Sequence, residues 1–347
     1  MAARNAHKAF IYACALLDLD ARWLYPKDSK HLCECNISAE ELNLALASCN
    51  ELPDAVYVTS PDYLGNIADI AGLSAVCHSY GIPLLVDNAH GAYLAFLSRS
   101  MHPMSLGADM CADSAHKTLP VLTGGAYLHV SKNYDICEDT ARSAMALFAS
   151  TSPSYLILQS LDMCNAYLES GYTDRLNKCI ERTRSLKERL LALGFSAESS
   201  EELKIVIKRR SYGISGIELA QHLRKYNVEA EFADNDLLVL MVTPELDELD
   251  FERVEAAFAA LKPMSYDSLA EITQSTAVRP QALISIRSAM LAPCETVSVS
   301  QSVGRICAAP TVSCPPAVPI VMSGELIDRD CAKLLEHYGL QSIDVVK

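Results

Sequence analysis

The feature that most constrains the fold is an alternation of short apolar segments with amphipathic ones between residues 55 and 130. Residues 55–60 have the pattern of a strand, and 67–80 that of a helix closed by Gly81. Residues 82–86 read as a strand buried on both faces. Continuous apolar strands separated by helices are typical of parallel sheets covered on both faces. We therefore predict an α/β layer with a mostly parallel sheet.

Chemically active side chains follow two of these apolar segments. Asp87 comes directly after one of them, and Ser114, His116 and Lys117 are expected in a loop after the next. Ligands of such sheets bind beyond the carboxyl ends of the strands, so we expect these side chains to face one crevice. A lysine in a partly apolar pocket can lose its proton and attack carbonyl groups. A carboxylate beside it can keep a pyridinium nitrogen protonated, and these two groups together suit pyridoxal-phosphate chemistry.

Simpler explanations of the same residues stay open on pattern alone. Aspartate is common in turns, so Asp87 also fits a turn position. Lys117 also fits a solvated charge on a surface loop. His7 fits a polar position on an amphipathic helix.

The rest of the chain divides into further helical and α/β regions. A helix is predicted at 5–17, and Ser38 with Glu41 has the spacing of a capping box that opens another at about residue 39. One apolar stripe marks a long helix at 174–193, namely Leu176, Ile180, Thr183, Leu186 and Leu190. Further elements are predicted as helices at 156–169, 216–226, 251–261 and 327–338 and as strands at 203–208 and 236–243. A polar break is expected at 262–276. We predict four regions, at 1–150, 151–195, 196–265 and 266–347.

Composition excludes several classes of protein. The net charge of -14 argues against a nucleic-acid binder, which needs a basic face. No apolar run reaches the roughly 18 residues that cross a bilayer, and no cleavage site follows the apolar start, so we expect neither membrane nor secretion. The 13 cysteines lack zinc-motif spacing, so we predict no metal site. Scattered thiols fit a reducing cytoplasm.

Two motifs carry a family resemblance. Residues 86–93 read Val-Asp-Asn-Ala-His-Gly-Ala-Tyr, and residues 113–120 read Asp-Ser-Ala-His-Lys-Thr-Leu-Pro. Together they resemble the large domain of the bacterial ornithine/lysine/arginine decarboxylases, pyridoxal-phosphate enzymes with the aspartate-aminotransferase-like fold (fold type I). The resemblance covers essentially the whole chain and continues at 4–8, 59–65, 151–155, 302–306 and 315–319.

This resemblance implies a role for each motif residue in the large domain. Lys117 would form the Schiff base with pyridoxal 5'-phosphate, and Asp87 would pair with the pyridine nitrogen. His7 would stack on the cofactor ring, and His90 would line the ring pocket. Asn88 stands where many relatives carry Glu, and we expect this departure to be tolerated, as we do Tyr93 in place of His.

The resemblance also implies residues around the phosphate and the substrate. Ser114 and His116 would lie near the phosphate or the substrate, and Ser152 could reach a phosphate of its own or of a neighbouring subunit. Relatives build their active sites at a dimer interface, so a homodimer or larger assembly is expected. A basic substrate needs an acidic partner, for which Glu295 is a candidate.

The activity implied is decarboxylation of arginine, lysine or ornithine to the corresponding amine in polyamine metabolism. Lys117 would carry the cofactor, and either His116 or Lys117 would return a proton to the substrate. Relatives carry a phosphate-binding loop upstream of the segment that resembles 4–8, and we expect this chain to lack that loop. An aminotransferase or aldolase-type enzyme on the same fold is one alternative. An inactive subunit that assembles with intact ones is another.

Overall fold

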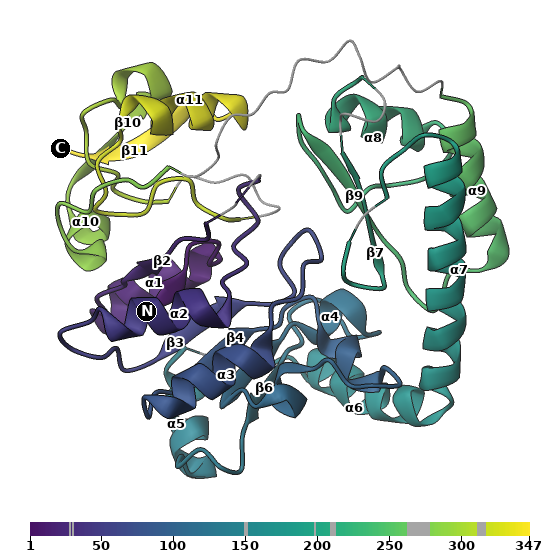
Figure 1. Cartoon of the computed structure of the whole chain (residues 1–347), viewed down its shortest axis with the longest axis horizontal. Helices are drawn as coiled ribbons and strands as arrows, with labels where there is room; N and C mark the ends of the chain where they lie inside the picture. The colour runs from purple at the N-terminus through teal and green to yellow at the C-terminus, as the bar shows by residue number, and fades with distance from the viewer. Residues whose placement is uncertain are drawn as a thin grey trace.

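The larger of the sheets lies in the lower half of Figure 1 and contains six strands. The computed structural model describes residues 1–27, 29, 31–148, 152–197, 199–208, 213–261, 278–310 and 317–347. The strands, in the order β2-β1-β3-β4-β5-β6, are Trp23–Leu24, Ala2–Ala3, Val56–Thr59, Leu84–Asp87, Met110–Asp113 and Tyr127–Val130. All pairs are parallel except β5 with β6. The predicted mostly parallel sheet is therefore confirmed.

Helices cover this sheet on both faces. The helices of this part of the chain are α1 (Lys8–Leu17), α2 (Ala39–Ala47), α3 (Ile70–Ser79), η1 (Ala92–Phe96), η2 (Pro103–Leu106), α4 (Ala115–Thr118) and α5 (Glu138–Phe148). Apolar side chains of α2 and α3 pack with Val56, Val58, Leu84 and Val86 in one core cluster. Because side chains alternate along a strand, Thr59 and Asp87 face the opposite side, where α1 lies.

The ends of these helices follow their capping residues. Ser38 and Glu41 form the predicted capping box of α2. The predicted start of α1 at residue 5 was wrong, because His7 is extended and its Nδ1 accepts the N–H of Ala9 at 3.1 Å. His7 is therefore the N-cap of α1. The helix α5 was not predicted.

Two long helices lead to a second, smaller sheet. They are α6 (Tyr155–Glu169) and α7 (Tyr172–Ala192), and α7 runs along the right side of Figure 1. The small sheet has the order β7-β9-β8, with β7 (Lys204–Lys208), β8 (Phe232–Ala233) and β9 (Leu237–Met241). The helices α8 (Gly216–Arg224) and α9 (Glu248–Ala259) pack against it in one core with α7. The predicted stripe of α7 is buried throughout.

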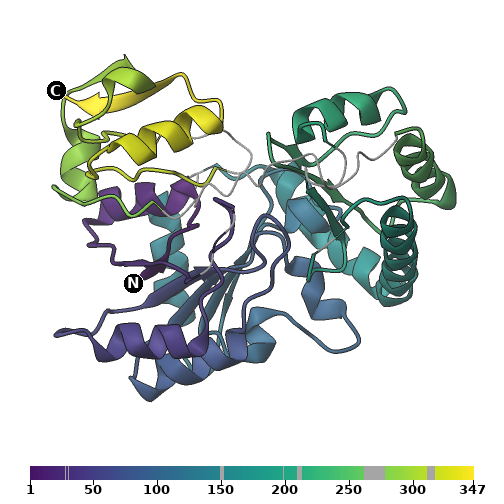
Figure 2. The same cartoon turned by 45° about the horizontal axis from the view of Figure 1, so that its top comes forward.

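The C-terminal part lies above α1 and β2 in Figures 1 and 2. Its elements are α10 (Ile286–Leu291), β10 (Cys294–Ser298), η5 (Val299–Gln301), α11 (Arg329–His337) and β11 (Ser342–Val346), with β10 antiparallel to β11. Side chains of α1 and α10 share an apolar cluster. Both nitrogens Nη1 and Nη2 of Arg4 donate to Glu325 at 2.8 Å, which ties this part to the large sheet. The polar break predicted at 262–276 lies outside the described residues.

Across the part of the chain that is described, no helix combines the length and apolar character needed to cross a bilayer.

Candidate active site

Lys117 lies at the carboxyl edge of the large sheet, in the short helix α4. The loop predicted for His116 and Lys117 was wrong, because the chain turns directly after β5. The N–H of Lys117 donates to the carbonyl of Ser114 at 2.9 Å, and that of Leu119 to Ala115 at 2.8 Å. This turn holds the half-buried Lys117 side chain over the end of the sheet.

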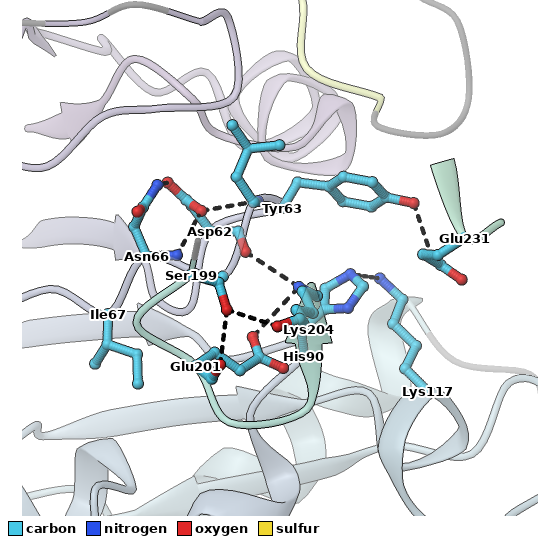
Figure 3. A network of polar contacts seen from close by, with 12 residues as sticks. Asp62, Tyr63, Asn66, Ile67, His90, Lys117, Ser199, Glu201, Lys204 and Glu231 are labelled. Carbon is cyan, nitrogen blue, oxygen red and sulfur yellow. Dashed lines mark hydrogen bonds and ion pairs between the residues drawn. The ribbon is translucent and has the colours of Figure 1, made fainter. Parts of the chain in front are cut away.

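His90 contacts the amine of Lys117. The His90 Nε2 and Lys117 Nζ atoms are 3.3 Å apart (Figure 3). Burial holds the pKa of His90 well below its usual range, and the charges of Lys204 and Lys117 lower it further. A neutral His90 can accept a hydrogen bond from Lys117 at Nε2, which places its own proton on Nδ1. Among the described residues, that buried Nδ1 atom has no hydrogen-bond partner.

His7 and Asp87 belong to the same group of side chains. Burial lowers the pKa of the half-buried His7, the Asp87 carboxylate opposes that shift, and Lys117 adds to it. Asp87 and Lys117 therefore both lie within electrostatic range of His7. The structure thus brings together His7, Asp87, His90 and Lys117, four of the residues that the sequence indicated.

The surroundings of Asp87 fit a ring nitrogen partner. Its Oδ2 accepts the hydroxyl of Tyr57 at 3.0 Å, and its Oδ1 accepts the N–H of Ala89 at 3.2 Å. In register with Asp87 lie Thr59 on β3 and the exposed Ala112 on β5. Thr59 Oγ1 is buried and finds no hydrogen-bond partner among the described residues. An oriented carboxylate, an unsatisfied hydroxyl and a small exposed side chain suit a flat polar ligand such as the pyridine ring of pyridoxal phosphate.

The remaining predicted residues have separate positions. His116 Nδ1 lies 3.0 Å from the carbonyl oxygen of Gly125, which can only accept, so Nδ1 carries a proton and Nε2 is the ring atom left to exchange one. Ser114 precedes α4, and its side chain makes no capping hydrogen bond. Ser152 is exposed ahead of α6.

An acidic side chain that the sequence did not single out lies beside this group. Tyr63 packs edge-on against His90 with ring centroids 5.1 Å apart, and its hydroxyl donates to Glu231 Oε1 at 2.8 Å (Figure 3). Glu231 belongs to the small sheet, one residue before β8, and therefore approaches from a distant part of the sequence. Glu295, the earlier candidate, is on β10 and pairs with Arg305 at 2.7 Å.

A buried ion pair connects Tyr63 to the small sheet. The side chains of Lys204 and Glu201 are both fully buried, and Lys204 Nζ lies 3.4 Å from Glu201 Oε2. Lys204 Nζ also donates to the carbonyl of Asp62 at 3.3 Å and lies 5.6 Å from the Tyr63 ring centroid. Figure 3 shows Lys204 between the turn at Asp62 and the side chain of His90.

This arrangement defines a class of protein before any comparison. A lysine at the carboxyl edge of a mostly parallel sheet, with an aspartate ending the adjacent strand and a histidine near each, is an arrangement that suits a fold-type I pyridoxal-phosphate enzyme.

Comparisons with known proteins agree with that class. Residues 1–210 match the family model "Orn/Lys/Arg decarboxylase, major domain", and residues 265–341 match "Orn/Lys/Arg decarboxylase, C-terminal domain". The chain therefore belongs to the Orn/Lys/Arg decarboxylase family, whose members are pyridoxal-phosphate-dependent decarboxylases.

Individual relatives and structures support the family and the fold. The uncharacterized protein YaaO of Bacillus subtilis is 30% identical over 96% of this chain and 72% of the relative. An arginine decarboxylase of the same organism is 28% identical, over 94% of this chain and 70% of the length of that decarboxylase. The constitutive lysine decarboxylase of E. coli has the same fold, with a TM-score of 0.78 and 16% identity over 100% of this chain. The chain spans 66% of that decarboxylase.

Proposed function

We propose that this protein decarboxylates a basic amino acid with pyridoxal 5'-phosphate bound at Lys117. The observation that carries the proposal is the 3.3 Å contact between Lys117 Nζ and the buried His90, with His7 and Asp87 in the same group. The family and the fit of the Asp87 surroundings support the cofactor. The substrate class is supported by the arginine and lysine decarboxylases among the relatives and by the position of Glu231.

The residues divide the chemical work. When bound, the cofactor supplies a conjugated ring that accepts the electron pair left by the departing carboxylate. Lys117 provides the amine that holds the cofactor, and neutral His90 accepts a hydrogen bond from it at Nε2. Asp87 keeps a proton on the ring nitrogen, oriented by Tyr57. His116 Nε2, together with the Lys117 amine, is the proton source for the substrate carbon. Ser114 and Ser152 are proposed phosphate contacts, and His7 is proposed to lie against the ring.

Glu231 would bind the cationic end of the substrate. The Tyr63 hydroxyl occupies Oε1 of Glu231, so Oε2 remains to accept a hydrogen bond from an ammonium or guanidinium group. Such a charge-assisted bond contributes about 1.5–3 kcal/mol, or roughly a factor of 10 to 100 in kcat/KM. This role would make the small sheet part of the substrate site.

The test is decarboxylation by the purified chain supplied with pyridoxal phosphate. Arginine, lysine and ornithine are offered separately, and released CO2 and amine are measured. We expect turnover of one of them, none by Lys117→Ala, and a roughly 10- to 100-fold lower kcat/KM for Glu231→Gln. Glu229→Gln is the matched control, because Glu229 is exposed two residues away and pairs with Arg224. A keto acid in place of CO2 would identify an aminotransferase, and no product from any substrate would refute the proposal.

A second copy of the chain is the proposed partner. None of the residues of α5 is buried, and α6 buries only Cys164 among its 15 residues. Large apolar side chains of these two helices and of the chain before β6 are exposed: Leu122, Met145, Leu147, Phe148, Tyr155, Leu156, Leu158 and Met163. Patches of this kind mark interaction surfaces. The patch continues to the site, because the N–H of Leu122 donates to Ser160 Oγ at 3.1 Å on the chain that follows α4.

Cytoplasmic location and an amine product for polyamine metabolism belong to the same proposal. The twelve cysteines of the described residues are all free thiols, which fits a reducing compartment.

A further inference from the structure

We propose that Cys111, Asp113, His102 and His129 form a zinc site on the face of the large sheet opposite Ala112. The site is independent of the decarboxylase function. Cys111 and Asp113 are two residues apart on β5, so both point to one face while Ala112 points to the other. His129 lies opposite Cys111 on β6, and His102 precedes η2.

The three other donor groups surround the Asp113 carboxylate. His102 Nε2 and His129 Nε2 lie 3.0 and 2.9 Å from the same Asp113 Oδ2 atom. Cys111 Sγ lies 3.3 Å from Asp113 Oδ1. Ligands at about 2.0–2.3 Å around a tetrahedral zinc ion are about 3.3–3.8 Å apart. The ligand atoms of His102, Cys111 and Asp113 already lie within 4.8 Å of one another, and the more exposed His129 side chain would turn toward them to complete the site. The sulfur, two imidazoles and a carboxylate are donors that zinc prefers.

Charge and burial favour a divalent cation. Cys111, Asp113 and His102 are buried. Two negative ligands, a thiolate and a carboxylate, neutralise Zn²⁺ and leave no net charge inside the protein. The His129 side chain is 38% exposed, which gives an ion a path from solvent. Asn88 Nδ2 donates to Asp113 Oδ1 at 2.7 Å and would orient the ligating carboxylate.

Zinc binding has a definite proton balance. The Cys111 thiol releases one proton to solvent as the Zn–S bond forms. Both imidazoles stay neutral and coordinate through Nε2, with their proton on Nδ1. For His102 this replaces the acceptor role of Nδ1 toward the Met104 N–H, a contact of 3.3 Å. The Nε2 protons that now face Asp113 Oδ2 move to Nδ1 through solvent, so metal–ligand bonds replace the two His–Asp113 hydrogen bonds and the long Met104 contact.

Cysteine spacing could not reveal this site, because its donors come from two strands and the residue before η2. Only one donor is a cysteine, and the sequence therefore predicted no metal. Among the described residues, His31, Asp234 and Asp236 also converge, and the Cys33 thiol interacts with His31. Cys111→Ser, rather than a thiolate signature alone, therefore distinguishes the two clusters.

The test is titration of the full-length protein with Co²⁺, followed by displacement with Zn²⁺. We expect a thiolate-to-cobalt charge-transfer band that saturates at one ion per chain and disappears when Zn²⁺ is added. Cys111→Ser should lose the band, and His129→Gln, altered at the most exposed ligand, should bind at least tenfold more weakly. Cys77→Ser is the matched control, because Cys77 is a buried thiol on α3, which packs against the same sheet. This variant should keep the band.

Several outcomes would overturn the proposal. These are no band in the wild-type protein, an unchanged band in Cys111→Ser, or unchanged affinity in His129→Gln. Binding without a thiolate band that Asp236→Asn abolishes would place the ion at the other cluster. Circular dichroism of each variant checks folding, and the wild-type and His129→Gln titrations decide the matter even when Cys111→Ser does not fold.

Discussion

Single side chains set the protonation state of the site. His90 is buried and neutral, and it lies between the Lys117 amine and the Tyr63 ring. A second positive charge next to Lys117 would repel a cationic substrate and compete for the same carboxylates. Burial of His90, aided by Lys204, prevents that second charge. The effect of His90 protonation on stability can consequently be measured without any cofactor.

The lowered pKa of His90 predicts a pH dependence of stability. The unfolded chain takes up a proton at His90 below about pH 6.5, whereas the folded chain does so only at lower pH. The contribution of His90 to the free energy of unfolding therefore falls as pH drops below about 6.5, by up to about 1.4 kcal/mol per pH unit. His90→Gln removes this loss. The free energy of unfolding of the variant, relative to that of the wild-type protein, should therefore rise as pH falls from about 7.5 to about 5.5.

Urea denaturation at the two pH values measures the effect. His78→Gln is the comparison, because the His78 side chain is half exposed and also pairs with a carboxylate. An equal pH response of the wild-type protein and His90→Gln would contradict a neutral buried His90.

Ala317 predicts a stabilising substitution. Its φ of 56° is in the left-handed region, which costs a residue with a Cβ atom about 1 kcal/mol or more. Glycine avoids this cost but has more freedom in the unfolded chain, so Ala317→Gly should raise the free energy of unfolding by about 0.5–1 kcal/mol. Ala292→Gly, at a φ of -71°, should lower it instead. Thermal denaturation compares the two, and a loss of stability in Ala317→Gly would show that the strain is absent.

The residues that the sequence could predict are those that its motifs contain. Lys117, His90 and Asp87 follow strands of one parallel sheet, and the ends of such strands meet at one edge. Glu231 could not be found in this way, because it approaches from a second sheet whose position depends on tertiary packing. The strand β8 that follows Glu231 was not predicted, and its sequence gives no sign of what the neighbouring side chains face.

At the scale of elements, the turn after β3 is attached to the start of β7. The N–H of Glu201 donates to the carbonyl of Gly65 at 2.9 Å, and Lys204 donates to the carbonyl of Asp62. A Cβ atom on Gly65 would lie 3.3 Å from the Cβ atoms of Glu201 and Ser199. This close approach holds Tyr63 between His90 and Glu231.

The buried pair at this junction predicts strong coupling. Lys204→Met would leave Glu201, whose pKa is already raised by burial, without its cation, and should cost about 3–5 kcal/mol. Lys204→Met combined with Glu201→Gln should recover part of that loss, giving a coupling energy above about 1 kcal/mol. A double-mutant cycle in urea measures it. Additive effects of the two substitutions would contradict a direct ion pair.

Local sequence signals predicted the elements unevenly. The capping box of α2 was confirmed because its two hydrogen bonds are made by residues within one turn. The turn α4 was missed because four residues are too few to show helical periodicity. The helix α5 has no buried residue, so no core contacts explain its pattern within one chain. Its exposed apolar side is the reason that we propose a partner outside the fold.

The exposed apolar side chains of α5 and α6 lead us to expect a dimer. A second copy of the chain that covers this patch would also approach Leu122 and the turn that holds His116. The division of the chain at residues 150, 195 and 265 stays a prediction, whereas the three sheets themselves are clear in the structure.

Sedimentation velocity tests the assembly. The wild-type protein should sediment as a dimer, and Leu156→Glu, at a side chain that is 68% exposed, should weaken dimerisation at least about 100-fold by burying a charge. Leu249→Glu is the matched control, because Leu249 is 64% exposed on α9, away from the patch. A monomeric wild-type protein, or equal effects of both substitutions, would refute the interface.

The central claim is that Lys117 is the residue that carries the cofactor. It is tested most directly by adding pyridoxal phosphate, reducing with borohydride and mapping the modified peptide by mass spectrometry. We predict one pyridoxyl group per chain, on Lys117, and none in Lys117→Arg. Modification at another lysine, such as the buried Lys204, or no modification at all, would contradict the site proposed here.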